Sequence, residues 1–313
     1  SVLLQQLSDR KGVVKGFGLD AGSPSYTNPR DGHLIVGGYD KVRVSASFKD
    51  YNISDTQISR RICPLQVIIT ELILSRPGIE DVILSSRGEQ IPACIEPYDV
   101  LFRFPERTLR AFAQETEFAN GTLPDPSEFY IVEPGITYPS DIGFNGSLKF
   151  TLDNDFVVEI PNEELVHPLR GIARDGTKTL MTNTTEINVF RDVALLDTAV
   201  LGKAFLSRVY LVVEYRSSGP IFRIAKSNSG NLPPNPVPFE PDCTPSQPDQ
   251  GPNLGKIIGI AVGTINNVTD RSTLSHVRYW HLLEGSSRRF NLTPVLSFVG
   301  FTRQLYLQLL SGI

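Results

Sequence analysis

The sequence contains little cysteine and no concentration of positive charge. Its 313 residues include only 3 cysteines, Cys63, Cys94 and Cys243, which are too few for the disulfide framework of a small secreted scaffold. The formal net charge is -4 and the pI is about 5.7. No run or stripe of Lys and Arg stands out from this balance, so we expect no nucleic-acid partner.

Signatures of cofactor and metal chemistry are also missing. The sequence has no phosphate loop, no dinucleotide-binding fingerprint and no Gly-x-Ser-x-Gly motif. Its 4 histidines lack metal-ligand spacing: His276 and His281, for example, would lie on different faces of a helix. We therefore expect no cofactor and no bound metal.

No apolar run is long enough to cross a membrane. The run from Ile257 to Gly263 ends at Asn266, far short of the ~20 apolar residues that a spanning helix needs. The segment 292–313 is more apolar, but it carries Arg303 near its middle. A charged side chain at the centre of a spanning helix costs about 2.5 to 3.5 kcal/mol in a bilayer. We expect the tail, residues 255–313, not to span a membrane, and its structure is not defined by the sequence.

The apolar residues that are present follow the pattern of strands. They make up 40% of the chain, which is enough for a sizeable core. A helix is predicted over residues 2–7 and another over 105–112, with Pro105 in its first turn. Strands are predicted over 13–19, 32–40, 64–70, 82–84, 129–132, 147–152, 156–160 and 210–215. Strands without a repeating helix between them predict a mainly β fold.

Residues 227–254 differ sharply in composition from the segments before them. Prolines recur along this segment and leave it without a periodic apolar pattern. Such a composition is typical of extended linkers and stalks. We predict a disordered linker here, with the folded unit ending near Ala225.

The stretch from Ala93 to Pro105 carries the main candidate for chemistry. A buried strand, Ala-Cys-Ile, runs into Glu96, Pro97 and Tyr98 before the sequence turns apolar again. Position by position it resembles the segment of pepsin-like aspartic proteases that carries their second catalytic aspartate. In that family two apolar residues precede Asp-Thr/Ser-Gly. The resemblance puts Glu96 at the position of the catalytic aspartate, Pro97 at the Thr/Ser and Tyr98 at the Gly.

Two further stretches match the same family in the expected order. Residues 32–40 end in Gly37-Gly38-Tyr39-Asp40, similar to the family's Leu/Phe-Gly-Gly-x-Asp. Residues 199–206 contain Val-Leu-Gly, which in the family closes the loop around the catalytic strand. There Gly202 lets the backbone pass close to that strand. The resemblance implies the C-terminal lobe of a pepsin-like bilobal β-barrel or sandwich fold with few short helices. It assigns residues 1–30 to an interlobe segment and residues 31–226 to the lobe.

The resemblance implies an aspartic endopeptidase, a hydrolase of extended peptides, but the motif is altered. Glu96 adds a methylene that displaces its carboxyl by about 1 Å, which can cost about 100-fold in rate. Pro97 removes a backbone N–H, and Tyr98 puts a large side chain where the family needs glycine. Such a protease also needs a second carboxylate from an N-terminal lobe, which this sequence does not contain. We therefore expect no proteolysis by this chain alone.

Several alternatives remain open at this point. The chain could be a catalytically inactive secreted or surface glycoprotein that uses the lobe to bind peptide or protein. It could act as a noncanonical protease whose cleft forms with an upstream lobe and holds a peptide or protein substrate. It could also pair with a second copy, which would bring two Glu96 side chains together.

Two other acids near the motifs are weaker candidates. Asp197 lies in Leu-Leu-Asp-Thr-Ala, which is similar to the catalytic motif. This stretch, however, runs directly into Val-Leu-Gly, which is already matched to the segment that closes the loop in the family. Asp99 is expected to be a solvated loop acid. For Cys63 and Cys94, which the resemblance puts on neighbouring segments, a disulfide is favoured over two buried thiols and would add about 3 to 4 kcal/mol. Cys243 is left unpaired.

Glycosylation patterns favour a secretory route. Asn-x-Ser/Thr begins at Asn52, Asn120, Asn145 and Asn183, and again at Asn267 and Asn291 in the tail. We expect an extracellular protein, secreted or at the cell surface, whose sequence is most similar in character to the fungal members of the family. The chain begins at Ser1 without a signal peptide. Ile257 to Gly263 looks like the opening of a membrane anchor in fungal surface proteins, so membrane anchoring is possible in a full-length form.

Overall fold

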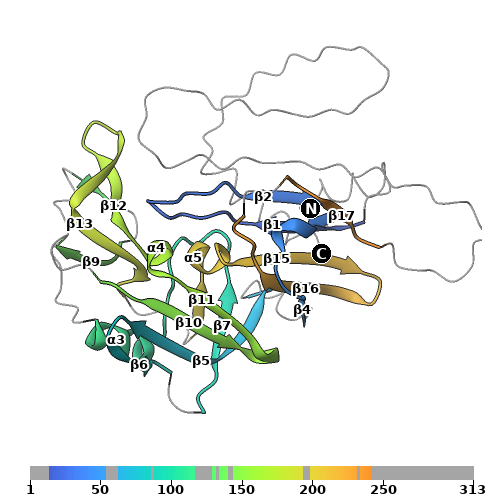
Figure 1. Cartoon of the computed structure of the whole chain (residues 1–313), viewed down its shortest axis with the longest axis horizontal. Helices are drawn as coiled ribbons and strands as arrows, with labels where there is room; N and C mark the ends of the chain where they lie inside the picture. Colours follow the sequence, from blue (N-terminus) through green and yellow to red (C-terminus); the bar gives the residue numbers. More distant parts are fainter. Residues whose placement is uncertain are drawn as a thin grey trace, which may run out of the picture.

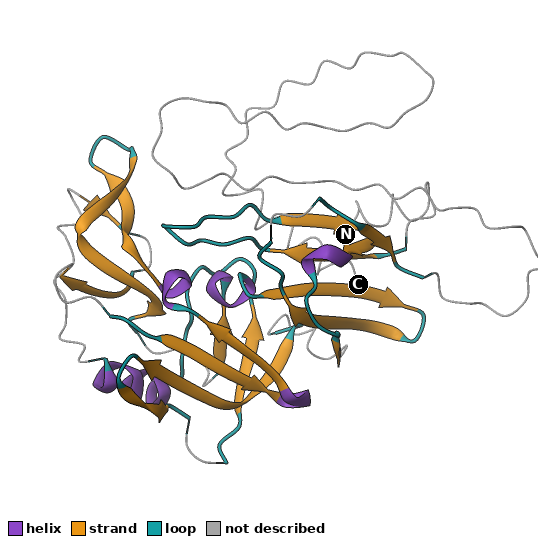
Figure 2. Cartoon of the chain, viewed as in Figure 1, coloured by secondary structure: helices purple, strands orange, loops and turns teal. Residues whose placement is uncertain are grey.

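The computed structural model describes residues 14–53, 63–85, 88–116, 129–131, 134–139, 144–192, 198–230 and 233–240. Over these residues the chain is mainly β with few short helices, which confirms the predicted fold class (Figures 1 and 2). The predicted helix at 2–7, Asp197, Cys243 and the tail lie outside the described residues.

A five-stranded antiparallel sheet joins the two ends of the described region. Its order is β2-β1-β15-β16-β4. These strands are β1 (Gly16–Asp20), β2 (His33–Val36), β4 (Lys49–Asn52), β15 (Val209–Arg216) and β16 (Gly219–Lys226). The central strand β15 is buried on both faces, with Leu211 in the main core and Tyr210 in a second apolar cluster. Because β1 pairs with β15, the segment assigned to 1–30 contributes a strand to this sheet.

The second sheet carries the stretch that resembles the protease motif. Its order is β11-β10-β5-β7-β14, and β6 pairs with β5 outside this path. These strands are β5 (Gln66–Arg76), β6 (Ile79–Ile83), β7 (Ile91–Ile95), β10 (Ser147–Leu152), β11 (Phe156–Ile160) and β14 (Ala199–Leu201). The pairing of β14 with β7 is parallel, and the other pairs are antiparallel.

One irregularity in β5 keeps its apolar side chains on the core side. Val67 and Ile69 are buried at alternate positions, and so are Leu72 and Leu74, but the two pairs are out of phase by one residue. The register with β10 shifts at this point. A bulge of this kind is needed because an uncorrected one-residue slip would turn the second half of the strand towards solvent.

A four-stranded antiparallel sheet forms the third layer. Its order is β8-β12-β13-β9, built from β8 (Phe129–Tyr130), β9 (Gly135–Pro139), β12 (Val166–Ala173) and β13 (Lys178–Phe190). The β12–β13 hairpin extends away from the rest of the molecule in Figure 1. The ring of Phe129 lies over Gly171, where a Cβ would come within 2.4 Å of it.

The Pro-rich segment continues the fold beyond its predicted boundary. β17 (Pro236–Pro238) pairs with β3 (Gly38–Asp40), and Phe239 is buried against Tyr210 and Val212. The prediction that the segment from residue 227 onward lacks a core is therefore wrong for residues 236–239, which form a paired strand and a buried ring. The physical reason is that β15 has an apolar second face, which this segment covers. Prolines can lie in such an edge strand, where their missing N–H groups are not needed for pairing.

The helices are short and follow strands. The helix predicted at residues 105–112 is α3 (Glu106–Glu115), which buries Leu109 and Phe112. The others are α4 (Asn162–Leu165) and α5 (Lys203–Leu206), with 3-10 turns η1 (Lys41–Arg43) and η2 (Asp153–Asp155). Two stacked aromatic pairs share the ring of Phe102, with centroid distances of 5.8 Å to Phe104 and 5.3 Å to Phe150. These rings fill the core beneath the loop that follows β7.

Candidate functional site

Glu96 stands at the point where β7 ends, held between two neighbouring segments. The Ile95 N–H donates to the Leu65 carbonyl at 3.0 Å, and the Glu96 N–H donates to the Leu201 carbonyl at 3.0 Å. β14 runs parallel to β7 with Leu201 opposite Ile95. The two parallel strands therefore end side by side, and both enter loops at the same edge of the sheet.

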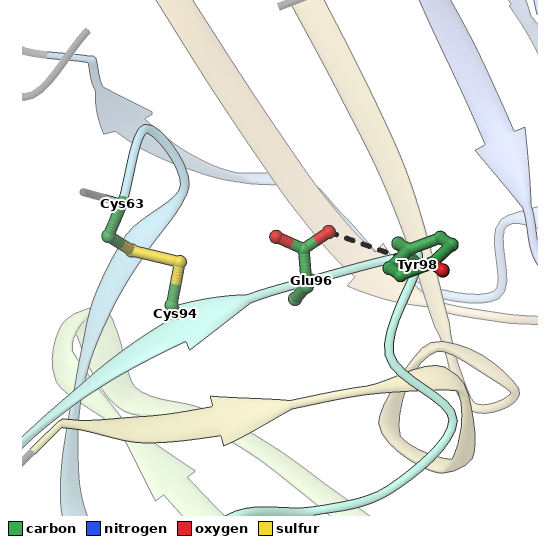
Figure 3. Close-up of a disulfide and its surroundings, with 4 residues drawn as sticks. All are labelled: Cys63, Cys94, Glu96 and Tyr98. Carbon is green, nitrogen blue, oxygen red and sulfur yellow. Dashed lines mark hydrogen bonds between the residues drawn. A yellow bond between two sulfur atoms is a disulfide. The ribbon is translucent and has the colours of Figure 1, made fainter. Parts of the chain in front are cut away.

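The loop after Glu96 folds back on that residue. The Asp99 N–H donates to the Glu96 carbonyl at 3.1 Å, and the Tyr98 N–H donates to Glu96 Oε1 at 3.3 Å (Figure 3). Tyr98 is 45% exposed and Val100 is 53% exposed, although both are large apolar side chains. The loop therefore presents a carboxylate and two apolar side chains on one short exposed segment.

Asp99 differs from its prediction as a solvated loop acid. Its carboxylate accepts from Arg103 Nε at 2.6 Å and from the Leu101 N–H at 3.0 Å. Both side chains of the Asp99–Arg103 ion pair are largely buried, and the Arg103 guanidinium lies 4.2 Å from the centre of the Phe190 ring. The sequence-based expectation is wrong because this partner, four residues along the chain, curls back over the loop. Asp99 is engaged with Arg103 and the Leu101 N–H and so braces the loop.

Gly202 has the close approach that the resemblance implies. A Cβ at this position would lie 2.5 Å from the Leu101 carbonyl oxygen and 2.6 Å from the Asp99 carbonyl oxygen. The next residue, Lys203, donates its backbone N–H to the Asp99 carbonyl at 2.8 Å. The loop after β14 is thereby fastened to the loop after β7, and only glycine leaves the backbones room to meet.

The favoured disulfide is present. Cys63 and Cys94 are bonded, with a Cα–Cα distance of 5.6 Å and a separation of 31 residues. Both are buried. Figure 3 shows the bridge on β7, on the same strand that leads to Glu96. It fixes the start of β5 to the strand that carries the candidate carboxylate.

The Gly-Gly-x-Asp match proves to be a structural motif. Gly37 has φ of 77°, and a Cβ on Gly38 would lie 2.4 Å from the Val237 carbonyl oxygen. Asp40 is buried, and its Oδ1 accepts from the Val42 N–H at 3.2 Å and from the Asn235 N–H at 2.9 Å. These contacts cap η1 and attach the segment that leads into β17.

A second set of buried charged groups lies between β1 and η1. Asp20 is fully buried and accepts from Arg30 Nη1 at 2.5 Å, and Arg43 lies 3.9 Å from it. Arg43 also approaches His33 Nε2 at 3.2 Å. Burial, aided by the Arg43 charge, lowers the pKa of His33. This network ties elements of the five-stranded sheet together and lies away from Glu96 in the sequence and in its contacts.

A third buried set, which the sequence did not reveal, lies on α4, β12 and β13. Glu164, His167 and Glu186 are all buried. His167 Nδ1 lies 2.8 Å from the Pro168 carbonyl and 3.7 Å from Glu186 Oε2, and its Nε2 lies 2.8 Å from Asn188 Oδ1. No spacing signal could have found this set, because it depends on the pairing of β12 with β13.

Burial shifts the pKa of each of these groups. It raises the pKa of Glu164, with hydrogen bonds from Ser23 opposing the shift, and it raises the pKa of Glu186, with the Gly135 N–H opposing it. It lowers the pKa of His167 to about 4, an effect to which the Arg170 charge adds. Perturbed groups of this kind often mark functional sites, although structural networks perturb pKa values as well.

The glycosylation positions that the structure describes are open to solvent. Asn52, Asn145 and Asn183 are exposed, at the end of β4, before β10 and on β13. Asn120 lies outside the described residues, as do Asn267 and Asn291. Attachment of glycans at these positions stays a prediction.

Two features are absent from the described residues. No group of three or more His, Cys, Asp or Glu side chains there is arranged to hold a metal ion. Within the same residues, no helix has the length and apolar character needed to cross a membrane.

Comparison with known proteins gives distant likenesses to solved structures only. Neither a protein-family model nor a curated protein sequence matches the chain. Among solved structures, an aspartic proteinase from Irpex lacteus is similar at 13% sequence identity with a TM-score of 0.48. The match covers 72% of this chain and 60% of that proteinase chain. A likeness at this level assigns neither activity nor substrate, and the chain spans less than two thirds of that proteinase.

Proposed function

We propose that this chain is a homologue of the pepsin-like aspartic proteases whose Glu96 loop binds extended peptide or protein segments without cleaving them. The proposal rests on three motifs in family order and on the fastening of the β7 and β14 loops through Gly202. Binding would take place at the exposed edge where these two parallel strands end.

The observation that carries the proposal is the hydrogen bonding of the Glu96 carboxylate. Glu96 Oε1 accepts from the N–H of Tyr98 in its own loop, and Pro97 between them has no N–H to offer. Aspartic proteolysis needs two carboxylates that share one proton. The nearest acid in the loop, Asp99, is engaged with Arg103. This arrangement favours a retained binding surface over a working acid pair.

The exposed side chains indicate the kind of segment that would bind. Tyr98 offers an aromatic ring and Val100 an aliphatic side chain, while Glu96 contributes negative charge beside them. Aromatic side chains that are apolar over most of their surface, with one polar group, are favoured at binding surfaces. We expect preference for an extended segment that has an apolar residue next to Lys or Arg.

Binding and cleavage can be tested separately with the purified full chain. Fluorescence anisotropy with a library of labelled extended peptides should give saturable binding. Tyr98→Ala should weaken it by about tenfold, as expected for an anchor worth ~1.4 kcal/mol. The matched control is Tyr26→Ala, which removes a tyrosine of the same 45% exposure from the β1–β2 loop. Equal weakening by both variants would reject the loop as the binding surface.

Cleavage is the outcome that would overturn the noncatalytic part. Peptides incubated with the chain between pH 3 and 7 should remain intact by mass spectrometry. Cleavage that a pepstatin-type inhibitor blocks and that Glu96→Gln abolishes would establish a working site instead. The same Glu96→Gln variant should reduce affinity for peptides with Lys or Arg and leave affinity for uncharged peptides unchanged.

The proposed setting is extracellular. A buried disulfide is typical of oxidising compartments, and the described glycosylation positions are exposed. Expression through a eukaryotic secretory pathway should add glycans at Asn52, Asn145 and Asn183. A mass decrease on enzymatic deglycosylation, lost stepwise in Asn→Gln variants, tests this directly.

A further inference from the structure

The buried histidine behind the candidate loop has an unusual hydrogen-bonding environment. Asn188 Nδ2 donates to the Glu164 carbonyl at 2.8 Å, which fixes the orientation of the amide and points Oδ1 at His167 Nε2. His167 Nδ1 faces the Pro168 carbonyl at 2.8 Å. Both ring nitrogens therefore face oxygens that can only accept.

A neutral ring cannot satisfy this arrangement. Neutral imidazole has one N–H and one nitrogen lone pair, so one of the two oxygens must face a lone pair. Flipping the Asn188 amide moves the mismatch to the Glu164 carbonyl and does not remove it. Only the doubly protonated ring makes both contacts hydrogen bonds. Glu186 Oε2 lies 3.7 Å from Nδ1, but burial raises the pKa of this carboxyl, so it takes up a proton before the ring does and does not act as a counter-ion in acid.

The protonation of the His167 ring depends on opposing effects. Burial and the Arg170 guanidinium on β12 disfavour the charged ring, while the contacts to Pro168 and Asn188 favour it. Other charged groups surround the set: Glu186 on β13, Glu164 on α4, and Lys203 on α5, which interacts with Arg170. The ring is neutral at pH 7 and gains its proton only in acid.

The same asparagine connects the histidine to the candidate loop. The Asn188 carbonyl accepts from the Phe102 N–H at 2.8 Å, and the Phe102 carbonyl accepts from the Phe190 N–H at 2.7 Å. Phe102 follows the Glu96–Val100 segment and lies beside Arg103, which holds Asp99. A change at the Asn188 side chain therefore reaches the loop through one short stretch of β13.

We propose that His167, with Asn188 as its hydrogen-bond partner across the two strands, is a proton sensor that ties β12 more firmly to β13 behind the Glu96 loop in acid. In neutral solution the ring has one N–H, so only one of its two contacts, to the Pro168 carbonyl or to Asn188 Oδ1, is a hydrogen bond. In acid both ring contacts are hydrogen bonds, and the Asn188 amide is held from both of its ends, by His167 and by the Glu164 carbonyl. The protonation step is independent of the proposed function, whereas its effect on ligand affinity rests on it.

NMR on the full chain with 15N-labelled histidine tests the protonation step without any ligand. Between pH 7.5 and 3.5, the His167 ring signals, assigned by their loss in His167→Gln, should titrate with a midpoint well below 6.5. The Asn188 side-chain amide and the backbone amides of Phe102 and Phe190 should shift with the same midpoint. Glu186→Gln should change this midpoint little, because the Glu186 carboxyl is already protonated where the ring titrates. His33→Gln, the matched control, should leave it unchanged.

Three results would overturn the proposal. The His167 ring could stay neutral until the protein unfolds, it could be charged already at pH 7.5, or it could titrate without any matching shift at Asn188 and Phe102. If the variants do not fold, the wild-type titration still decides the question.

Peptide affinity forms the second arm of the test. In the wild type, the Kd values at pH 7.5 and pH 4.5 should differ by about fivefold or more. In His167→Gln, only the change in Kd that comes from titration of the peptide's own charges should remain. An unchanged ratio would reject coupling to the loop. Absence of all peptide binding would reject the proposed function, while the NMR result would stand by itself.

Discussion

Gly202→Ala should loosen the candidate loop by steric contact alone. The backbone at Gly202 has φ of -83°, which alanine adopts without strain, so conformational preference does not enter. The added methyl would lie 2.5 Å from the Leu101 carbonyl oxygen and 2.6 Å from the Asp99 carbonyl oxygen. Both are backbone atoms in a braced loop and cannot rotate away. Overpacking of this kind costs about 1 to 3 kcal/mol.

Urea denaturation measures this loss, and a second glycine separates the causes. Gly176 has φ of 83° and nothing within 4 Å of a Cβ, so Gly176→Ala should cost about 1 to 2 kcal/mol through backbone conformation alone. Gly176→Asn should recover most of that loss, because asparagine tolerates this conformation. Gly202→Asn should recover none. Alanine therefore destabilises the two sites for different reasons, and the asparagine substitution distinguishes between them.

The amide of Lys203 provides a local readout of the same change. Its N–H donates to the Asp99 carbonyl at 2.8 Å, and displacement of the loop should weaken this bond and speed its hydrogen exchange. A Gly202→Ala variant within about 0.5 kcal/mol of the wild type, with unchanged exchange at Lys203, would refute the claim that the two loops are in tight contact.

Further perturbations test the other parts of the structure. Replacing Cys63 and Cys94 together by serine should cost about 3 to 4 kcal/mol in urea denaturation, because the bridge closes a loop of 31 residues; no loss relative to the wild type would contradict this. Phe239→Ala should cost about 3 kcal/mol, because the ring is buried on the second face of the five-stranded sheet; Tyr26→Ala, at an exposed ring, should cost little, and equal losses would contradict the packing of β17. The pKa of His167 falls from 6.5 to about 4 on folding, so its contribution to stability is present above pH 6.5 and is lost as the pH falls towards 4, by about 3 kcal/mol. Thermal melts between pH 7 and 4 should show this loss in the wild type and a smaller one in His167→Gln, and parallel curves would refute it.

The sequence by itself determined the fold class and the position of the candidate loop. Period-two apolar patterns such as that of β10 are local, and they specify strands wherever one face is buried. Gly202 could be assigned a close backbone contact, because glycine is the residue that such a contact requires. The Cys63–Cys94 bridge was favoured, although the sequence left two thiols as an alternative.

Only the tertiary structure decided which polar groups meet. Asp99 was expected in solvent because no glycine follows it two residues on, as the family motif requires, yet Arg103 curls back to pair with it over the Phe190 ring. The proline content of residues 227–254 predicted a linker without a core, but the second apolar face of β15 offered Phe239 a place to pack. His167 and Glu186 carried no signal at all, because the register of β12 against β13 alone brings them together. Local composition fixes strands and turns, whereas burial and pairing across the chain fix charges, contacts and pKa values.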